Sequence, residues 1–167
     1  MRPDGTASGP IIGDAAFMRL RDQDTPFGHA ARLAELVGES RTATETSTTV
    51  APGEVAVSPD GTFGVGLHLP DVQRSVAYDD ERTYEVLLYH VPTESAATVQ
   101  VTPAAAEYPV RQHGPRRLWD EAEVAHAWWV AHGRPARTRF GLTVTPEHQR
   151  IWLDEPSNPL ALRGTPR

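Results

Sequence analysis

The chain lacks two residue types altogether, because its 167 residues include neither cysteine nor lysine. Without cysteine there is no disulfide, no thiolate nucleophile and no cysteine-based zinc site. This composition is compatible with the reducing cytoplasm, where we expect the protein to be. Because lysine is absent, all 16 basic side chains are arginines. We attribute this to the arginine preference of a GC-rich genome and infer no function from it.

The chain also lacks an excess of positive charge and a long apolar run. Its formal net charge is −6 at pH 7. It therefore has no positive field to attract phosphate backbones, and nucleic acid is not an expected partner. No apolar segment reaches the roughly 18 residues of a membrane helix, and residues 1–13 contain no apolar stretch typical of a signal peptide. We expect a protein that neither crosses a membrane nor is exported.

Motifs of catalysis or cofactor binding are missing as well. The seven histidines show no metal-ligand spacing, so we expect no metal site. The Gly64-x-Gly66 pair has no third glycine and is expected within a strand, so it lacks the context of a dinucleotide or adenosyl loop. Two weaker candidates for a functional site remain. His68 and His90 lie on adjacent expected strands, and residues 79–81 form an acidic cluster for which a solvated turn is the more common role.

Alternation of apolar and polar residues predicts about seven strands. The clearest are residues 63–69, 72–78 and 84–90, and the acidic sequence DDERT joins the last two into an antiparallel hairpin. Near the end of the chain, RFGLTV and RIWLD form a second hairpin around TPEHQ. Weaker strands are expected at residues 15–20, 44–50 and 97–101.

Two segments have helical character. Residues 29–38 are the weaker one, since they suit a turn and a strand equally well, and residues 114–135 are the stronger. Strands outnumber helices and cluster as hairpins, so the expected class is α+β, a mainly antiparallel sheet of about seven strands with one principal helix packed on it. We expect tails at residues 1–13 and 156–167 around a single domain at 14–155.

The stronger helical segment, GPRRLWDEAEVAHAWWVAHGRP, holds three of the four tryptophans of the chain. Successive helical residues are rotated by about 100°, so one face is expected to pack on the sheet. That face comprises Leu118, Ala122, Ala125 and Trp129. Pro115 suits the first turn of the helix, and Gly133 suits its C-terminal end.

Trp119 and Trp128 fall a quarter turn to either side of this face, and we expect both at its boundary. The common role of such residues is packing, because a buried indole removes a large apolar area from water. The alternative is a groove in which Trp119 or Trp128 lies beside Arg116 or Arg117, a combination typical of peptide and protein recognition surfaces. The sequence leaves both interpretations open.

Six segments of the chain are similar to parts of one known family. The most specific are GPRRLWDEAE (114–123), GRP (133–135), RFGLTV (139–144) and WLDEP (152–156). The more divergent are AAFMRLR (15–21) and FGVGLHLPDV (63–72). Together they resemble the C-terminal extension of actinobacterial protein-L-isoaspartate O-methyltransferase-like enzymes, which tailor ribosomally made peptides. The resemblance covers about residues 14–156.

The resemblance implies a function in peptide modification. In that family, a Rossmann-type domain holds S-adenosylmethionine and methylates an Asp side chain of a peptide, while the extension helps to engage the peptide. The present chain has neither an adenosyl-binding glycine loop nor alternating parallel strands and helices ahead of the extension. We therefore expect no catalytic residue and no cofactor in this chain itself, which is either an excised domain or a free-standing relative. The implied partners are a precursor or modified peptide and a methyltransferase domain in cis or in trans.

The candidate residues for binding the substrate peptide are Arg116, Arg117, Trp119 and Trp128. Two cations at the positive end of a helix dipole are unfavourable unless an anion binds there, and an acidic peptide provides one. The alternative is an internal ion pair of Arg116 or Arg117 with Asp120 or Glu121. For the whole protein, the alternatives are a free-standing binding or scaffold protein in a peptide natural-product cluster, and a small enzyme with a site assembled from scattered residues.

Overall fold

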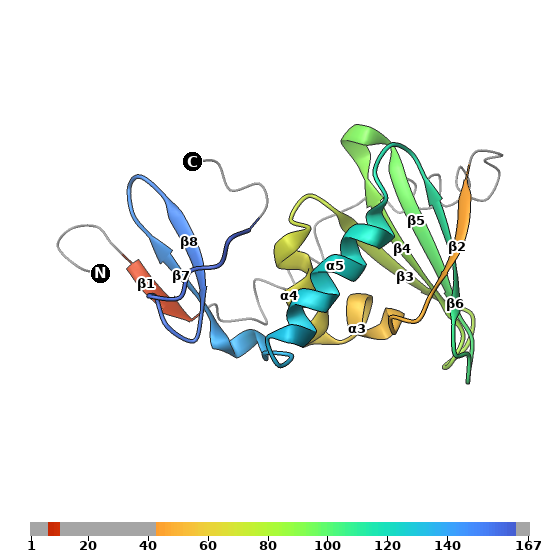
Figure 1. The fold of residues 1–167 in the computed structure, drawn as a ribbon, viewed down its shortest axis with the longest axis horizontal. Coiled ribbons are helices and arrows are strands. Elements are labelled where there is room, and N and C mark those ends of the chain that lie inside the picture. The colour runs from red at the N-terminus through yellow and green to blue at the C-terminus, as the bar shows by residue number, and fades with distance from the viewer. Residues whose placement is uncertain (1–6, 11–42, 163–167) are drawn as a thin grey trace.

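The computed structural model describes residues 7–10 and 43–162, which form an α+β fold (Figure 1). The expected fold class is confirmed at this level. The helices of the described part are α3 (Pro52–Ala56), α4 (Pro59–His68) and α5 (Leu118–Ala131), with the short 3-10 helices η1 (Val91–Thr93) and η2 (Arg137–Arg139). The strands are β1 (Ala7–Pro10), β2 (Thr44–Thr48), β3 (Gln73–Tyr78), β4 (Tyr84–His90), β5 (Ser95–Val101), β6 (Tyr108–His113), β7 (Phe140–Val144) and β8 (Gln149–Leu153).

Five of these strands form one antiparallel sheet in the order β2-β6-β5-β4-β3. The expected hairpin of β3 and β4 is confirmed. Its turn is closed by the Asp79 amide, which donates to the Thr83 carbonyl at 2.9 Å, and by the Asp80 carboxylate, which accepts from the Arg82 and Thr83 amides. Strand β6 was not predicted, because its sequence YPVRQH carries a proline and shows little apolar alternation.

The expected single sheet is wrong, because β7 and β8 pair in a second sheet. Helices α4 and α5 lie between the two sheets (Figure 1). Residues 7–10, which we expected in a tail, form β1 and pair with β7. Part of the expected C-terminal tail also lies along β8, since the Leu160 amide donates to the Ile151 carbonyl at 2.8 Å. The strand and helix expected at 15–20 and 29–38 lie outside the described residues.

Residues 63–69 were expected as a strand, and this prediction is wrong because most of them lie in α4. The start of this helix has a sequence signal that we missed. Ser58 is the N-cap, its hydroxyl accepts from the Gly61 amide at 3.4 Å, and Pro59 occupies the first turn. Apolar residues at every second position matched a strand pattern, but tertiary packing decides the conformation here. His68 therefore ends a helix and does not lie on a strand beside His90.

The glycines of α4 allow α5 to approach closely. A Cβ atom on Gly64 would lie 2.4 Å from Trp129 Cδ1, and one on Gly61 would lie 2.1 Å from the Glu54 carbonyl oxygen. The Trp129 ring thus occupies the space that a larger side chain would need, and its indole N–H donates to the Pro135 carbonyl at 3.1 Å. These glycines serve helix packing, although glycine is a poor helix former.

Helix α5 packs with the expected face toward the core. Its four residues Leu118, Ala122, Ala125 and Trp129 are all buried. The helix begins at Leu118, so Pro115 precedes it and does not lie in its first turn, while Gly133 ends it with a φ of +78°.

No helix within residues 43–162 is long and apolar enough to cross a bilayer.

We expect Trp129→Ala to lower the free energy of unfolding by about 3–5 kcal/mol, because it empties the space between α4 and α5. Trp128→Ala should have a smaller effect, since the Trp128 ring is only half-buried and lies between His68 and His132. Urea unfolding measures both values. Val124→Ala is the control, because Val124 is 66% exposed on the same helix. Equal, large losses at Trp128 and Trp129 would contradict the packing described.

Candidate functional site

Arg116 is held by acidic side chains of the chain itself. Its guanidinium forms two hydrogen bonds with Glu121, at 3.1 and 2.5 Å, and a third with Asp71 Oδ2 at 2.9 Å. The internal pair that the sequence left open is therefore present. The hydrogen bonds of Glu121 raise the pKa of Arg116, and those of Asp71 add to this effect. The Arg116 guanidinium thus already pairs with two carboxylates of the fold.

Trp119 was expected at the boundary of the helix, and this prediction is wrong because it is only 1% exposed. Helix α5 lies between α4 and the sheet, so more than one of its faces is covered (Figure 1). The Trp119 amide donates to Gln112 Oε1 at 2.9 Å, and Gln112 Nε2 donates to Asp120 Oδ1 at 2.7 Å. Gln112 of β6 thus supplies the cap that Arg117 at the N-cap position does not.

Arg117 and Trp128 are both half-buried, but they do not share one surface. They are separated by eleven helical positions, or about 16 Å along the axis of α5. No residue of the described part forms an ion pair with Arg117. The Trp128 ring lies near the other end of the helix, with ring centroids of His68 and His132 at 4.5 and 4.3 Å. The structure therefore does not bring the four expected residues together in one cluster.

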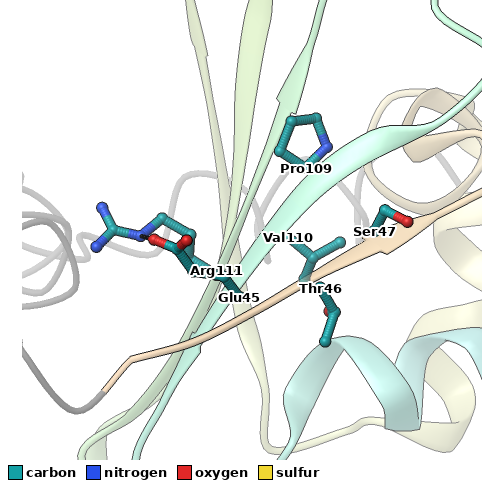
Figure 2. A pocket seen from close by; sticks show the side chains of 6 residues that line it. All are labelled: Glu45, Thr46, Ser47, Pro109, Val110 and Arg111. Atoms are coloured by element: carbon teal, nitrogen blue, oxygen red, sulfur yellow. Dashed lines mark ion pairs between the residues drawn. The ribbon is translucent and has the colours of Figure 1, made fainter.

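An open groove runs along β2 and β6 instead, with a volume of about 480 Å³ (Figure 2). Its lining residues are Glu45, Thr46, Ser47, Pro109, Val110 and Arg111. Val110 belongs to the core beneath the helices, so alternation places its two neighbours on the opposite face of the sheet. The groove therefore lies on the face away from α5. We did not predict it, because it needs β6, which the sequence did not reveal.

Two features of this groove favour a ligand with an extended backbone. First, β2 is an edge strand of its sheet, so one side of its backbone has no strand partner among the described elements. Second, the groove carries charged and polar side chains at its border. Arg111 Nε lies 3.3 Å from Glu45 Oε1, and the two side chains are 37% and 73% exposed. The Ser47 hydroxyl donates to Glu107 at 3.0 Å, also at an exposed position.

A second polar cluster near the start of α5 joins β4, η1 and β5 to the segments that hold Asp71 and Arg116. His90 Nε2 lies 3.2 Å from Asp71 Oδ2, and His90 Nδ1 lies 2.7 Å from Thr93 Oγ1. Thr93 Oγ1 is 2.8 Å from Ser95 Oγ, which accepts the Arg116 amide at 3.1 Å. These residues are spread over more than forty positions, from 71 to 116, so spacing in the sequence could not reveal the cluster. Of the two histidines that we considered, His90 contacts Asp71 and Thr93, whereas the His68 ring packs on Trp128.

The described residues do not fit the cofactor of the resembling family. Gly64 and Gly66 lie inside α4, and the space in front of Gly64 holds the Trp129 ring. A glycine loop that cradles an adenosyl group needs an open backbone ahead of a helix, and this segment provides none. In the same part of the chain, no group of three His, Asp or Glu residues is arranged to hold a metal ion.

Comparisons with known proteins add no relative to these observations. No protein-family model, curated protein or solved structure matches the chain. A functional proposal therefore depends on the groove, on the polar cluster and on the resemblance of short segments.

The ionisation of Asp71 should make stability depend on pH. Burial raises the pKa of Asp71, but its hydrogen bonds with Arg116 and with the backbone, together with the charges of Arg116 and His90, outweigh this effect, so the pKa lies below its ordinary value. A carboxylate with a lowered folded pKa stabilises the fold above its unfolded pKa of about 3.9, and this contribution is lost as pH falls through the folded pKa. We expect Asp71→Asn to lower the urea midpoint at pH 7.

The difference between the wild type and Asp71→Asn should shrink below about pH 4 and vanish where Asp71 is protonated in both states. Urea unfolding across a pH series measures it. Glu147→Gln, on the exposed turn between β7 and β8, is the control and should leave the midpoint unchanged at pH 7. A difference for Asp71→Asn that stays constant down to pH 2 would contradict the proposed ion pair.

Proposed function

We propose that this chain is an accessory domain that recognises the substrate peptide of an S-adenosylmethionine-dependent peptide aspartyl O-methyltransferase, and that it transfers no methyl group alone. The observation that carries the proposal is the open groove beside the edge of β2. An extended peptide can pair its backbone with an edge strand while its alternate side chains enter a neighbouring groove. The resemblance of residues 114–156 to the family extension supplies the link to peptide methylation.

The groove offers separate contacts for backbone and side chains. The Thr46 and Val110 pair forms its floor, because both side chains point to the opposite face. The ion pair of Glu45 and Arg111 borders one end, and Ser47 with Pro109 borders the other (Figure 2). An extended peptide therefore meets a flat floor between a charged and a small neutral wall.

The charged end suits a peptide that contains aspartate. The Arg111 guanidinium lies beside Glu45, whose side chain is 73% exposed. An aspartate carboxylate of the peptide can approach this cation, and a charge-assisted hydrogen bond to a guanidinium is favourable.

The proposed peptide site uses other residues than the sequence led us to expect, whereas the expected partners stay the same. Arg116 and Trp119 are committed to the fold, and Arg117 and Trp128 lie outside the groove. The partners we propose are a precursor or modified peptide and a methyltransferase domain in cis or in trans, in the cytoplasm. Joining the peptide to the domain raises the concentration of the peptide near the methyltransferase, which increases turnover without any contact to the reacting carboxylate.

A bulky side chain in the groove should block peptide binding. Ser47→Trp fills the wall beside the groove, and we expect it to weaken binding of extended aspartate-containing peptides by at least about tenfold. Ser75→Trp is the matched control. Register through β3, β4, β5 and β6 puts Ser75 on the same face of the sheet, but on the opposite edge strand.

Fluorescence anisotropy with a panel of labelled peptides measures the affinities, and thermal unfolding checks that both variants fold. Loss of binding in Ser47→Trp alone supports the groove. Unchanged binding in both variants, or equal loss in both, contradicts it.

The chain should not bind S-adenosylmethionine. The only closely spaced glycines of the described part are packed inside α4, where an adenosyl group cannot approach their backbone. Isothermal titration calorimetry at micromolar cofactor should show only the heat of dilution. A measurable dissociation constant in that range would contradict the role of an accessory domain without its own cofactor.

A further inference from the structure

The polar cluster near the start of α5 forms a directed chain of hydrogen bonds when His90 is neutral. The Arg116 amide donates to Ser95 Oγ. The Ser95 hydroxyl can then donate to Thr93 Oγ1, and the Thr93 hydroxyl can donate to His90 Nδ1. The remaining proton of the imidazole, on Nε2, faces the Asp71 carboxylate at 3.2 Å. Every hydroxyl and ring nitrogen in this arrangement has a partner of the correct kind.

We propose that Thr93 is a nucleophile that accepts acyl groups from activated esters, with His90 as its general base. A hydroxyl at hydrogen-bond distance from an imidazole, which a carboxylate in turn orients, is the arrangement that activates serine and threonine nucleophiles. This activity goes beyond the proposed peptide recognition and does not depend on it.

Exposure distinguishes the two hydroxyls of the cluster. Ser95 is 0% exposed and His90 is 8% exposed, so an ester cannot reach the serine. Thr93 is only partly buried, and its neighbours Val91 and Pro92 are exposed. Gly114 closes the cluster from behind, since a Cβ atom there would lie 2.7 Å from Ser95 Cα. Of the two hydroxyl residues of this cluster, Thr93 is therefore the one that is exposed to solvent in part.

The reaction needs only the ester and water. Thr93 Oγ1 attacks the carbonyl carbon while its proton moves to His90 Nδ1. The tetrahedral intermediate then collapses, the bond between carbonyl carbon and leaving oxygen breaks, and the leaving group departs as an alcohol or its anion. His90 gives the proton it received to the leaving oxygen or, for an anionic leaving group, to solvent water, and is neutral again. Water then attacks the acyl-threonine while its proton moves to His90, the bond between the carbonyl carbon and Thr93 Oγ1 breaks, and His90 returns the proton to Thr93 Oγ1 as a carboxylic acid leaves. Asp71 acts as a positioning residue for the imidazole.

A second pair of threonine and histidine, Thr145 and His148, provides a comparison within the same chain. Thr145 Oγ1 lies 3.2 Å from His148 Nδ1 on the exposed turn between β7 and β8. No carboxylate of the described residues pairs with His148, and the Thr145 hydroxyl instead contacts the His148 backbone. If exposure alone governed reactivity, Thr145 would react at least as fast as Thr93. If reactivity instead requires an imidazole that a carboxylate orients, Thr93 should react and Thr145 should not.

The test uses p-nitrophenyl acetate with the full chain. Because lysine is absent, side-chain amines contribute no background acylation. Trypsin cleaves after arginine and so separates Thr93, in residues 83–111, from Thr145, in residues 140–150. Mass spectrometry with fragmentation then locates the acetyl group. We expect acetyl-Thr93 and no acetyl-Thr145 in the wild type, and this comparison requires no variant.

Variants identify the base. His90→Gln should slow acetylation of Thr93 by roughly 100-fold, the usual contribution of a general base, while Thr93→Ser should retain it and Thr93→Val should lose it. Thermal unfolding confirms that each variant folds. Acetylation of Thr93 and Thr145 at equal rates, absence of acetyl-Thr93 together with no release of p-nitrophenolate above the rate of Thr93→Val, or an unchanged rate in His90→Gln would each overturn the proposal.

Discussion

The close approach of α4 and α5 determines how the layers of this protein are arranged. Trp129 fills the space in front of Gly64, and this contact fixes the distance between the two helices. The second sheet is then attached to α4 by two contacts. Phe63 and Phe140 have ring centroids 5.2 Å apart, and the Asp60 carboxylate accepts the Arg137 amide at 3.0 Å. A larger residue at position 64 would therefore disturb both the core and the attachment of the β7–β8 hairpin.

The start of α5 is the second point on which the structure depends. Its N-cap residue offers no side-chain cap, so Gln112 of β6 accepts the Trp119 amide from outside the helix. Arg116 adds ion pairs to Glu121 on the helix and to Asp71 beyond it. These contacts use the charged residues that would otherwise be free to bind a ligand. The charged residues at the N-terminal end of α5 thus stabilise the fold, and the peptide recognition that we propose uses another surface.

The sequence predicted those parts whose signal is local. The β3–β4 and β7–β8 hairpins and the buried face of α5 follow from alternation, turn residues and helical periodicity. Helix α4 was wrongly predicted as a strand. Its glycines make room for Trp129, which lies more than sixty residues away in the sequence, so no local pattern indicates why glycine occurs in a helix here. Trp119 was misplaced for a related reason, since periodicity shows which residues share a face but not how many faces are covered. The groove and the Thr93 cluster need contacts between distant segments, and no spacing in the chain encodes them.

Strand β6 contributes residues both to the core and to the groove. Its inward residues Val110 and Gln112 belong to the core and to the cap of α5, whereas its outward residues Pro109 and Arg111 line the groove. Because successive residues of a strand point to opposite faces, the core that buries Gln112 also fixes the direction of Arg111. The groove wall is therefore held rigid from behind, which reduces the entropy lost when a peptide binds. In the proposed complex the peptide is the flexible partner, and the edge of β2, which has no strand partner among the described elements, can order its backbone.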